Sequence, residues 1–329
     1  MNIAMDLAIK GIGTVSPNPL VGAVIVKDRK IVGEGFHQKA GEAHAEVNAV
    51  NSSAENLEGA ILYTTLEPCC HTNKKTPPCT KLIIEKKFKT VVVANLDPNP
   101  SVAGKGIEAL RRAGITVITD ICKELGEEVN KIFFKNMRTG LPFIHIKQAM
   151  TLDGKTASHT GDSKWITSAT ARSEVHELRY QYDAIMVGSK TANLDNPDLT
   201  CRRNEKVVKN IKRIIVYKSS KLKENLKVLN DSNKSDTMVV SGENLEEMLK
   251  ELFTKGVKSL LVEGGATMVS SFIDANLADS FTYYIAPRLL GNGTSIYINN
   301  AISSMSESKV LNGKWRTIPS GEIVFEGNF

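Results

Sequence analysis

The sequence predicts a chain of two successive α/β domains, and three observations support this. Apolar runs typical of buried strands alternate with segments of helical periodicity through about residue 120. The alternation restarts after the turn residues of "TGLP", so we place the boundary near residue 143, between domains 1–143 and 144–329. A length of 329 residues is also long for a single domain.

The first domain is expected to open with a helix, because the apolar residues of "MNIAMDLAIKGIG" fall at positions 3, 4, 7, 8 and 12. "LVGAVIVKDRKIVGEGF" then predicts a hairpin, since a polar turn separates an apolar run from a returning strand. The other elements expected here are a helix over 44–53, a strand and loop over 59–70, a helix over 79–88, a strand over 90–98, a helix over 106–114, a strand over 115–121 and one helix over 122–140.

The second domain is expected to open with a strand in "LPFIHIKQAMTLDG". The elements that follow are strands over 183–189, 212–218, 236–242, 259–265 and 280–287, and helices over 243–256 and 266–276. Gly264 and Gly265 lie between a strand and a helix, where backbone N–H groups can approach a phosphate at the helix N-terminus. A plain glycine-rich turn explains the pair equally well.

Composition and charge exclude several classes of protein. Hydrophobic residues make up 41% of the chain and charged residues 24%, which is ordinary for a soluble globular protein. No apolar run reaches the ~18 residues of a membrane helix. The N-terminus lacks a basic segment followed by a long apolar core, so we expect no secretory signal and a cytoplasmic protein. The net charge of +6 comes from scattered lysines, which suits an anionic small molecule better than nucleic acid.

The cysteines are unevenly distributed. Cys69, Cys70 and Cys79 lie within eleven residues, whereas Cys122 and Cys201 are isolated. The clustering favours a metal site in a reducing cytosol over a disulfide framework, with five free thiols as the simpler explanation. Because neighbouring residues rarely both bind one ion, the choice between Cys69 and Cys70 stays open at this point.

A candidate zinc site is formed by "HAE" together with the clustered cysteines. His44 supplies an imidazole, and two of the clustered cysteines supply thiolates, which leaves the fourth position of a catalytic zinc for water. Zinc lowers the pKa of that water from 15.7 to roughly 7. Glu46 lies on the same helical turn as His44 and can carry protons without binding the metal. This order of residues is typical of zinc-dependent base deaminases.

Motifs along the whole chain carry a more specific resemblance. They are "SPNPLVGAVIV", "GEAHAEVNA", "TLEPCCH", "KTPPC", "DPNPSVAGKGI", "MTLDGK", "GDSKWITS" and "DNPDLT". In this order they resemble the bifunctional pyrimidine deaminase/reductase family of riboflavin biosynthesis. The resemblance implies a cytidine-deaminase-like three-layer domain followed by a dihydrofolate-reductase-like α/β domain.

The resemblance also implies the reactions and the partners. The first is hydrolytic deamination of 2,5-diamino-6-(5-phosphoribosylamino)pyrimidin-4-one. The second is reduction of the ribosyl side chain by NADPH to give 5-amino-6-(5-phosphoribitylamino)uracil. The implied cofactors are Zn²⁺ and NADPH, and the implied partner is a small phosphorylated pyrimidine. The family is usually oligomeric, and no nucleic acid or membrane partner is expected.

Site residues of the first domain follow from the same resemblance. Cys69 and Cys79 become the sulfur ligands, and Cys70 becomes a bystander. The pyrimidine and its phosphate would be bound by Asn18, His37, His71 and either Lys74 or Lys75. The choice between the two lysines stays open, because this loop has an extra residue and carries Asn73 where the family usually has glycine.

Site residues of the second domain are likewise implied by the family. On the cofactor side they are Ala149, Trp165, Thr191, Asp195, Gly265, Ala266, Thr267, Met268, Val269, Ser270 and Ser271. On the substrate side they are Ser163, Arg179, Leu199, Arg202 and Glu263. The two arginines suit a phosphate group. No side chain is identified as the proton donor of the reduction, for which water and Glu263 are the two candidates.

Several of these residues have simpler explanations. Asn18 can be a turn residue, His37 an exposed loop histidine, Arg179 a helix-surface residue and Trp165 a core aromatic residue. Asp153 and Lys155 lie at a strand end, a favoured place for ligand contacts, but they can equally shape a turn.

Three other functions compete with the family assignment. A structural zinc would need a fourth protein ligand, such as Cys70 or His71. A nucleic-acid deaminase shares the zinc motif but typically has a short Pro-Cys-x-x-Cys, whereas nine residues separate Cys69 from Cys79 here. A zinc-stabilised scaffold without catalysis would have no use for Glu46.

Overall fold

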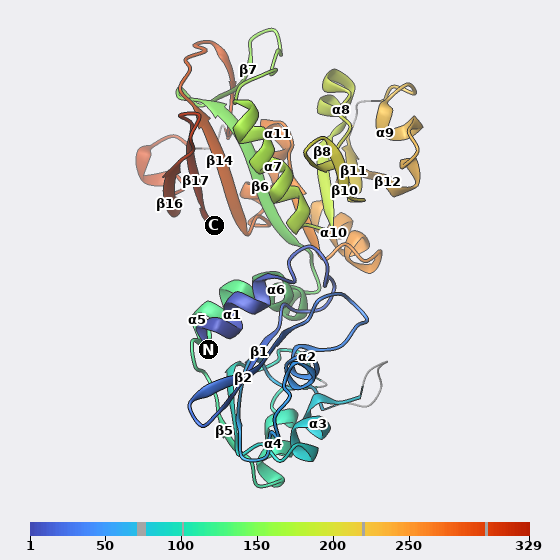
Figure 1. Ribbon diagram of the computed structural model, residues 1–329. Helices are drawn as coiled ribbons and strands as arrows, with labels where there is room; N and C mark the ends of the chain where they lie inside the picture. The colour runs from blue at the N-terminus through green and yellow to red at the C-terminus, as the bar shows by residue number, and fades with distance from the viewer. Residues whose placement is uncertain (71–76, 101, 219–220, 300–301) are drawn as a thin grey trace. The chain divides into compact units, whose positions relative to one another are not determined.

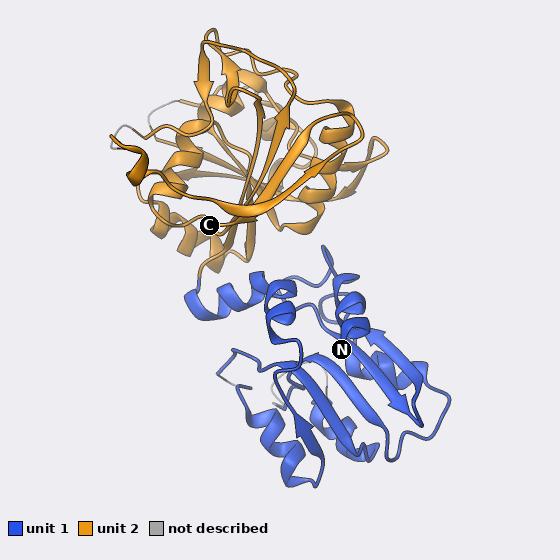
Figure 2. Cartoon of the chain, turned by 90° about the vertical axis from the view of Figure 1, so that its left-hand side faces the viewer, with its two compact units in different colours: residues 1–140 blue, residues 141–329 orange. Residues whose placement is uncertain are grey.

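The computed structural model describes residues 1–70, 77–100, 102–218, 221–299 and 302–329 (Figure 1). The chain divides into two units, residues 1–140 and residues 141–329, which Figure 2 colours separately. Within the described ranges, no helix is both long enough and apolar enough to cross a membrane.

The first unit is built on a five-stranded sheet with strand order β2-β1-β3-β4-β5. Its strands are β1 (Gly22–Lys27), β2 (Lys30–Phe36), β3 (Ile61–Leu66), β4 (Thr90–Asn95) and β5 (Thr116–Ile118). β1 is antiparallel to β2 and β3, whereas β3, β4 and β5 run parallel. The predicted hairpin turns at Asp28 and Arg29, whose φ angles of 47° and 62° are those that a two-residue turn requires.

Helices cover both faces of this sheet, which makes the unit a three-layer α/β structure as predicted. The helices before residue 120 are α1 (Asn2–Ile9), α2 (Ala45–Ser52), α3 (Cys79–Glu85) and α4 (Lys105–Arg112). On one face Ala49, Ile83 and Leu110 of α2, α3 and α4 join the main core. On the other face α1 packs through Leu7 against Val24 of β1.

The single helix predicted over 122–140 is instead two helices, α5 (Lys123–Val129) and α6 (Lys131–Thr139). Asn130 separates them, with a non-helical φ of −106° and ψ of 20°. Its carboxamide accepts a hydrogen bond from the N–H of Leu20 and donates one to the carbonyl of Leu20, both at 2.8 Å. The helical pattern cannot reveal this break, because the partner that stabilises it lies 110 residues away.

The second unit is built on an eight-stranded sheet with order β12-β11-β8-β13-β6-β14-β17-β16. In that order the strands are Thr237–Ser241, Lys212–Tyr217, Ala184–Gly188, Ser259–Val262, Phe143–Thr151, Ser280–Ala286, Ile323–Asn328 and Asn312–Thr317. The first six are parallel, β17 is antiparallel to β14, and β16 is antiparallel to β17. Neither β16 nor β17 was predicted from the sequence; every side chain of β16 is exposed, so no alternation of apolar residues arises there.

Smaller elements surround this sheet. The paired strands β9 and β10 are Cys201–Arg203 and Lys206–Lys209, and the paired strands β7 and β15 are Lys155–Ser158 and Gly293–Ser295. The helices are α7 (Ala169–Gln181), α8 (Ser189–Asp195), α9 (Lys227–Asn230), α10 (Leu245–Thr254) and α11 (Ala266–Asp274), with 3-10 turns at Lys234–Asp236 and Met305–Glu307.

The helices of the second unit pack on both faces of its sheet. Leu252 of α10 and Phe272 of α11 lie in a core with Ile144 on one face. Ala192 of α8 and Val175 of α7 pack against the other face, in two further cores. Ligands of open parallel sheets bind beyond the carboxyl ends of the strands. The candidate residues that follow β8 and β13 are therefore placed at one end of the sheet.

Candidate functional sites

Three elements of the first unit bring a nitrogen and two sulfur atoms together. His44 is the N-cap residue of α2, Cys69 follows β3, and Cys79 begins α3. Nδ1 of His44 lies 3.6 Å from Sγ of Cys69 and 3.3 Å from Sγ of Cys79. The three ligand atoms all lie within 4.8 Å of one another. Cys70 is half-buried and does not belong to this group, so the structure separates the two neighbouring cysteines.

The group fits zinc in both chemistry and spacing. Zinc binds imidazole nitrogen at about 2.0–2.1 Å and thiolate sulfur at about 2.3 Å, so tetrahedral ligands lie roughly 3.5–3.8 Å apart. The observed nitrogen–sulfur separation of 3.6 Å lies in this range, and the one of 3.3 Å lies slightly below it. With three ligands from the described part of the chain, the group matches a catalytic site, which keeps one position for water.

Glu46 lies beside the metal-ligand group in the first turn of α2. It is only 3% exposed, and its Oε2 lies 3.4 Å from Sγ of Cys79. Burial raises the pKa of this carboxyl, and the negative charge of Cys69 raises it further. A buried carboxyl group with a raised pKa next to a metal site is suited to taking up and releasing a proton.

A cavity of about 590 Å³, here called the N-terminal cavity, opens onto this group. Asn18, His37, His44, Glu46 and Cys69 all line it. His37 is 3% exposed, so the simpler explanation of an exposed loop histidine is wrong.

The protonation of His37 follows from its two ring contacts. Nδ1 lies 3.0 Å from the carbonyl oxygen of Ala43, and Nε2 lies 3.0 Å from Nδ2 of Asn18. Burial lowers the pKa of His37, which favours the neutral ring. Since a carbonyl only accepts, Nδ1 carries the proton and Nε2 accepts from the Asn18 amide. Asn18 is thereby oriented with its carbonyl oxygen free of this bond. His71, Lys74 and Lys75 lie outside the described residues.

Glu67 also lines the N-terminal cavity and has a structural role there. It belongs to the motif "TLEPCCH", but the motif alone does not reveal this role. Its buried carboxylate accepts four backbone N–H bonds. Oε2 accepts from Asp97 and Gly104 at 3.2 and 2.9 Å, and Oε1 accepts from Gly106 and Ile107 at 2.9 and 3.3 Å. These bonds hold the segment between β4 and α4, from which Asp97 lines the cavity. The signal available in the sequence was an acidic residue directly after a buried strand.

Replacement of Glu67 with glutamine should destabilise the first unit by about 2–4 kcal/mol. Whichever oxygen becomes an amide nitrogen, two backbone N–H donors then face another donor. Denaturant unfolding followed by far-ultraviolet circular dichroism measures the change. Both tryptophans, Trp165 and Trp315, belong to the second unit, so tryptophan fluorescence should report an unchanged transition there. The exposed Glu55→Gln is the matched control, and equal stability of the two variants would contradict the role given to Glu67.

The second unit contains a cavity of about 780 Å³, here called the C-terminal cavity. Nine of the sequence-predicted residues line it: Ala149, Ser163, Trp165, Arg179, Thr191, Asp195, Leu199, Arg202 and Glu263. They come from β6, the segment before α7, α7 itself, α8 with the loop after it, β9 and the residue after β13. Residues spread over more than a hundred positions of the sequence thus meet in one cavity.

The predicted segment from Gly265 to Ser271 does not line the C-terminal cavity. Gly265 is the N-cap of α11, and a Cβ added to it would lie 3.6 Å from Oγ1 of the cavity residue Thr191. The side chain of Val269 is completely buried in the core. A cofactor can therefore approach the backbone at the start of α11, but it cannot touch the side chain of Val269.

Three charged side chains that line the C-terminal cavity interact with one another. Arg179 donates to Glu263 through Nε at 2.7 Å and through Nη2 at 3.0 Å, and Nζ of Lys147 lies 3.6 Å from Oε2 of the same carboxylate. Their side chains are 10–15% exposed, so the simpler explanation of Arg179 as a helix-surface residue is wrong. Lys147 was not predicted from the sequence, although a lysine inside the apolar strand "FIHIKQAM" was the available signal.

The ionisation of Glu263 follows from this arrangement. Burial opposes its charge, but the positive charges of Arg179 and then Lys147 outweigh burial and lower the pKa of Glu263 to about 2. Glu263 is therefore a carboxylate at neutral pH. A carboxylate has no proton to donate, so the lowered pKa favours water over Glu263 as the proton donor of the reduction. Burial lowers the pKa of Lys147, so its ammonium group releases a proton more readily than that of an exposed lysine.

The structure also tests the simpler explanations of Trp165 and Asp153. Trp165 is 62% exposed, and the guanidinium carbon of Arg172 lies 4.4 Å from its ring centroid, so it is not a core aromatic residue. Asp153 accepts hydrogen bonds from the N–H groups of Leu290 and Gly291 and does not line the cavity. The hydrogen bond from Thr151 and those two N–H groups lower the pKa of Asp153 to about 2. Asp153 therefore shapes a turn.

Comparison with known proteins adds independent evidence. Residues 1–95 match the cytidine and deoxycytidylate deaminase zinc-binding region, and residues 142–321 match the RibD C-terminal domain. The riboflavin biosynthesis protein RibD of Bacillus amyloliquefaciens is 44% identical over 88% of this chain and 84% of that protein. The protein of the same name from Aquifex aeolicus is 41% identical over 99% of this chain and 96% of that protein.

Solved structures show the same similarity. A Thermotoga maritima diaminohydroxyphosphoribosylaminopyrimidine deaminase/5-amino-6-(5-phosphoribosylamino)uracil reductase aligns with a TM-score of 0.89 at 37% identity, over 99% of this chain and 96% of that chain. Acinetobacter baumannii RibD aligns with a TM-score of 0.88 at 36% identity, with the same two coverages. The expected order of folds, a cytidine-deaminase-like domain followed by a dihydrofolate-reductase-like domain, is confirmed.

Proposed function

Because this chain belongs to the RibD family of riboflavin-biosynthesis proteins, we propose that its N-terminal cavity deaminates a pyrimidine and its C-terminal cavity reduces the product. The chain is a bifunctional deaminase and reductase that uses zinc and NADPH. The observation that carries the assignment is the convergence of His44, Cys69 and Cys79 beside the buried carboxyl of Glu46.

The deamination is assigned to residues of the first unit. His44, Cys69 and Cys79 would hold zinc, which supplies an activated water molecule when bound. Glu46 would take one proton from that water and deliver it to the pyrimidine ring, and would then carry the second water proton to the departing amino group. The water oxygen replaces that group, and ammonia leaves. Asn18, oriented by His37, offers a carbonyl oxygen to the base.

The reduction is assigned to residues of the second unit. NADPH supplies the hydride for the opened ribosyl chain. Trp165, Thr191 and Asp195 would bind the cofactor, and Arg179 and Arg202 would bind the phosphorylated substrate. Because Glu263 already accepts two hydrogen bonds from Arg179, it orients this arginine and stabilises the charge of Lys147.

The substrate is proposed to be 2,5-diamino-6-(5-phosphoribosylamino)pyrimidin-4-one, and the final product 5-amino-6-(5-phosphoribitylamino)uracil. Purified protein should release ammonia from this substrate without NADPH and consume NADPH only after deamination. A tRNA anticodon hairpin tests the competing nucleic-acid deaminase. Ammonia release from the hairpin but not from the pyrimidine would overturn the assignment.

Removal of zinc should separate the two activities. After exhaustive chelation we expect ammonia release to fall to background, since the three metal-binding residues all belong to the first unit. NADPH oxidation with the deaminated substrate should persist. Added Zn²⁺ should restore ammonia release, and added Mg²⁺ should not. Full ammonia release from metal-free protein would contradict the site.

The setting of the enzyme is also part of the proposal. A cytoplasmic location suits the use of Cys69 and Cys79 as free thiolates. A homo-oligomer is proposed from the family resemblance, and light scattering on the purified full chain measures it.

A further inference from the structure

A rigid frame holds the loop after α8 against α9 in the second unit. Arg213 of β11 is 2% exposed and donates to both oxygens of Asp231, at 2.5 and 2.8 Å. The same guanidinium donates to the carbonyl oxygens of Val228 and Asp198, at 3.1 and 3.4 Å. The side chain of Asn196 accepts from the N–H of Lys227 at 2.8 Å. The backbones at 196–198 and 227–231 are therefore held together.

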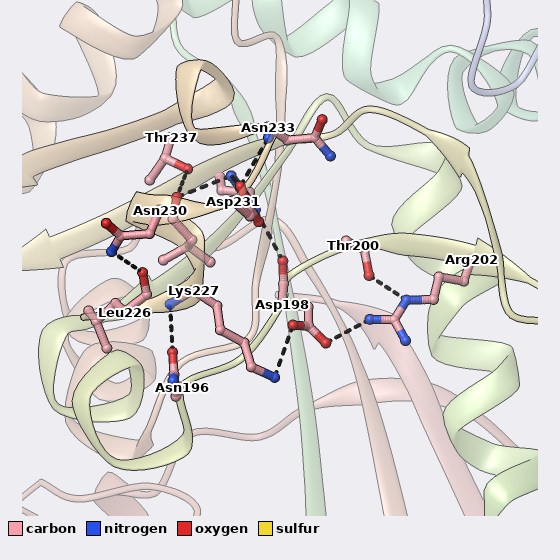
Figure 3. A network of polar contacts seen from close by, with 12 residues as sticks. Asn196, Asp198, Thr200, Arg202, Leu226, Lys227, Asn230, Asp231, Asn233 and Thr237 are labelled. Carbon is pink, nitrogen blue, oxygen red and sulfur yellow. Dashed lines mark hydrogen bonds and ion pairs between the residues drawn. The ribbon is translucent and has the colours of Figure 1, made fainter. Parts of the chain in front are cut away.

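On this frame, the carboxylate of Asp198 joins two basic side chains, as Figure 3 shows. Its Oδ2 lies 2.7 Å from Nη2 of Arg202, and its Oδ1 lies 3.3 Å from Nζ of Lys227. Nε of Arg202 donates to the hydroxyl of Thr200 at 2.7 Å, which fixes the plane of the guanidinium. Asp198, Arg202 and Lys227 all line the C-terminal cavity. The two cations therefore face one space.

Stability does not explain this arrangement. The side chains of Arg202, Asp198 and Lys227 are 31%, 42% and 58% exposed, and ion pairs at such positions contribute about 0–1 kcal/mol. One carboxylate also cannot neutralise two cations, and Glu205, 3.9 Å from Nη1 of Arg202, is 95% exposed. Lys227 places one of its three N–H donors toward Asp198, which leaves two for a ligand. The described lining of the cavity holds six basic and four acidic side chains, so it favours an anion.

We propose that Lys227 and Arg202, bridged by Asp198, together bind one phosphomonoester group in the C-terminal cavity. This rests on the proposed function, which gives Arg202 the substrate phosphate. Nη2 of Arg202 and Nζ of Lys227 each contact one oxygen of the Asp198 carboxylate. The oxygens of a phosphate group are spaced similarly to those of a carboxylate, so one phosphate can contact both nitrogens. Asp198 leaves one positive charge of the pair unbalanced, and the described lining of the cavity as a whole leaves two, which match the phosphate charge of nearly −2. Asp198 is a positioning residue, because it acts through the two cations.

The test is steady-state reductase kinetics of the full chain with the deaminated pyrimidine phosphate. Replacement of Lys227 with methionine should raise KM about tenfold or more and leave kcat nearly unchanged, because a charge-assisted contact is lost. Lys227→Arg should restore KM to within a few-fold of the parent. The control is Lys234→Met, which removes an exposed lysine that does not line the cavity. For the substrate without its phosphate, Lys227→Met should have no effect.

The two phosphomonoesters present in the reaction are distinguished by which KM changes. A rise for the pyrimidine supports binding of its phosphate, and a rise for NADPH but not NADH supports binding of the 2′-phosphate of the cofactor. In an Asp198→Ala background the effect of Lys227→Met should shrink to under about threefold, as coupled contacts require.

The outcomes that overturn the inference differ from those that overturn the proposed function. If Arg202→Met raises KM and Lys227→Met changes no KM, the phosphate-binding role of Lys227 is wrong, whereas the role of Arg202 in binding the substrate stands. If neither variant raises any KM, the assignment of Arg202 fails as well. Unchanged ammonia release and thermal unfolding establish that each variant is folded.

Discussion

Replacement of Glu46 with glutamine is expected to lower ammonia release by about 10²–10⁴-fold, the usual contribution of a general acid–base group. Glutamine keeps the shape of the side chain but cannot take up or release the proton. Zinc content should remain at one per chain, since Glu46 contributes no atom to the metal-ligand group. Ammonia release and metal analysis of the same preparation measure the two quantities.

Two controls make the Glu46 result specific. NADPH oxidation with the deaminated substrate should be unchanged, because Glu46 belongs to the first unit. Glu55→Gln removes an exposed carboxylate nearby in the sequence and should leave both activities unchanged. Parental ammonia release from Glu46→Gln, or loss of zinc along with activity, would show that Glu46 is not the proton carrier.

Replacement of Glu263 with glutamine is expected to destabilise the second unit by about 3–5 kcal/mol at pH 7, the usual cost of removing one partner of a buried ion pair. Arg179 and Lys147 would then remain buried without a counter-charge. Reductase activity should be lost, because the same bonds orient Arg179. Urea unfolding followed by tryptophan fluorescence measures the stability, since both tryptophans lie in this unit.

The pH dependence of this effect has a definite sign. The pKa of Glu263 is lowered from 4.5 to about 2 in the folded chain. Its stabilisation is therefore complete above about pH 4.5 and is lost as the pH falls through 2. The stability difference between parent and variant should be constant from pH 5 to 8 and should shrink toward pH 2. A difference that does not change down to pH 2 would contradict the lowered pKa.

A double-mutant cycle separates the ion pair from general disruption. Adding Lys147→Met to Glu263→Gln removes one of the two unpaired cations and should recover part of the lost stability. Glu246→Gln on the exposed face of α10 is the matched control, because its ion pair with Lys250 is solvent-exposed. Additive losses from Lys147→Met and Glu263→Gln would mean that the two charges do not interact.

Much of the N-terminal site could be predicted because its residues carry their chemistry in short motifs. His44 and Glu46 are two positions apart, and Cys69 lies just beyond a strand that the apolar run predicts. The break at Asn130 and the network around Glu67 could not be predicted in the same way. Both depend on hydrogen bonds between segments that are distant in the sequence.

By itself, the sequence determined the alternation of strands and helices, the two-domain organisation and the set of metal-binding residue types, because these depend on local periodicity and close spacing. The tertiary structure alone decided which charges meet. Lys147 reaches Glu263 because β6 and β13 are neighbours in the sheet, with Ile146 paired to Val262. Lys227 reaches Asp198 because Arg213 holds both backbones. Strand order and a buried guanidinium are long-range properties, and no local pattern encodes them.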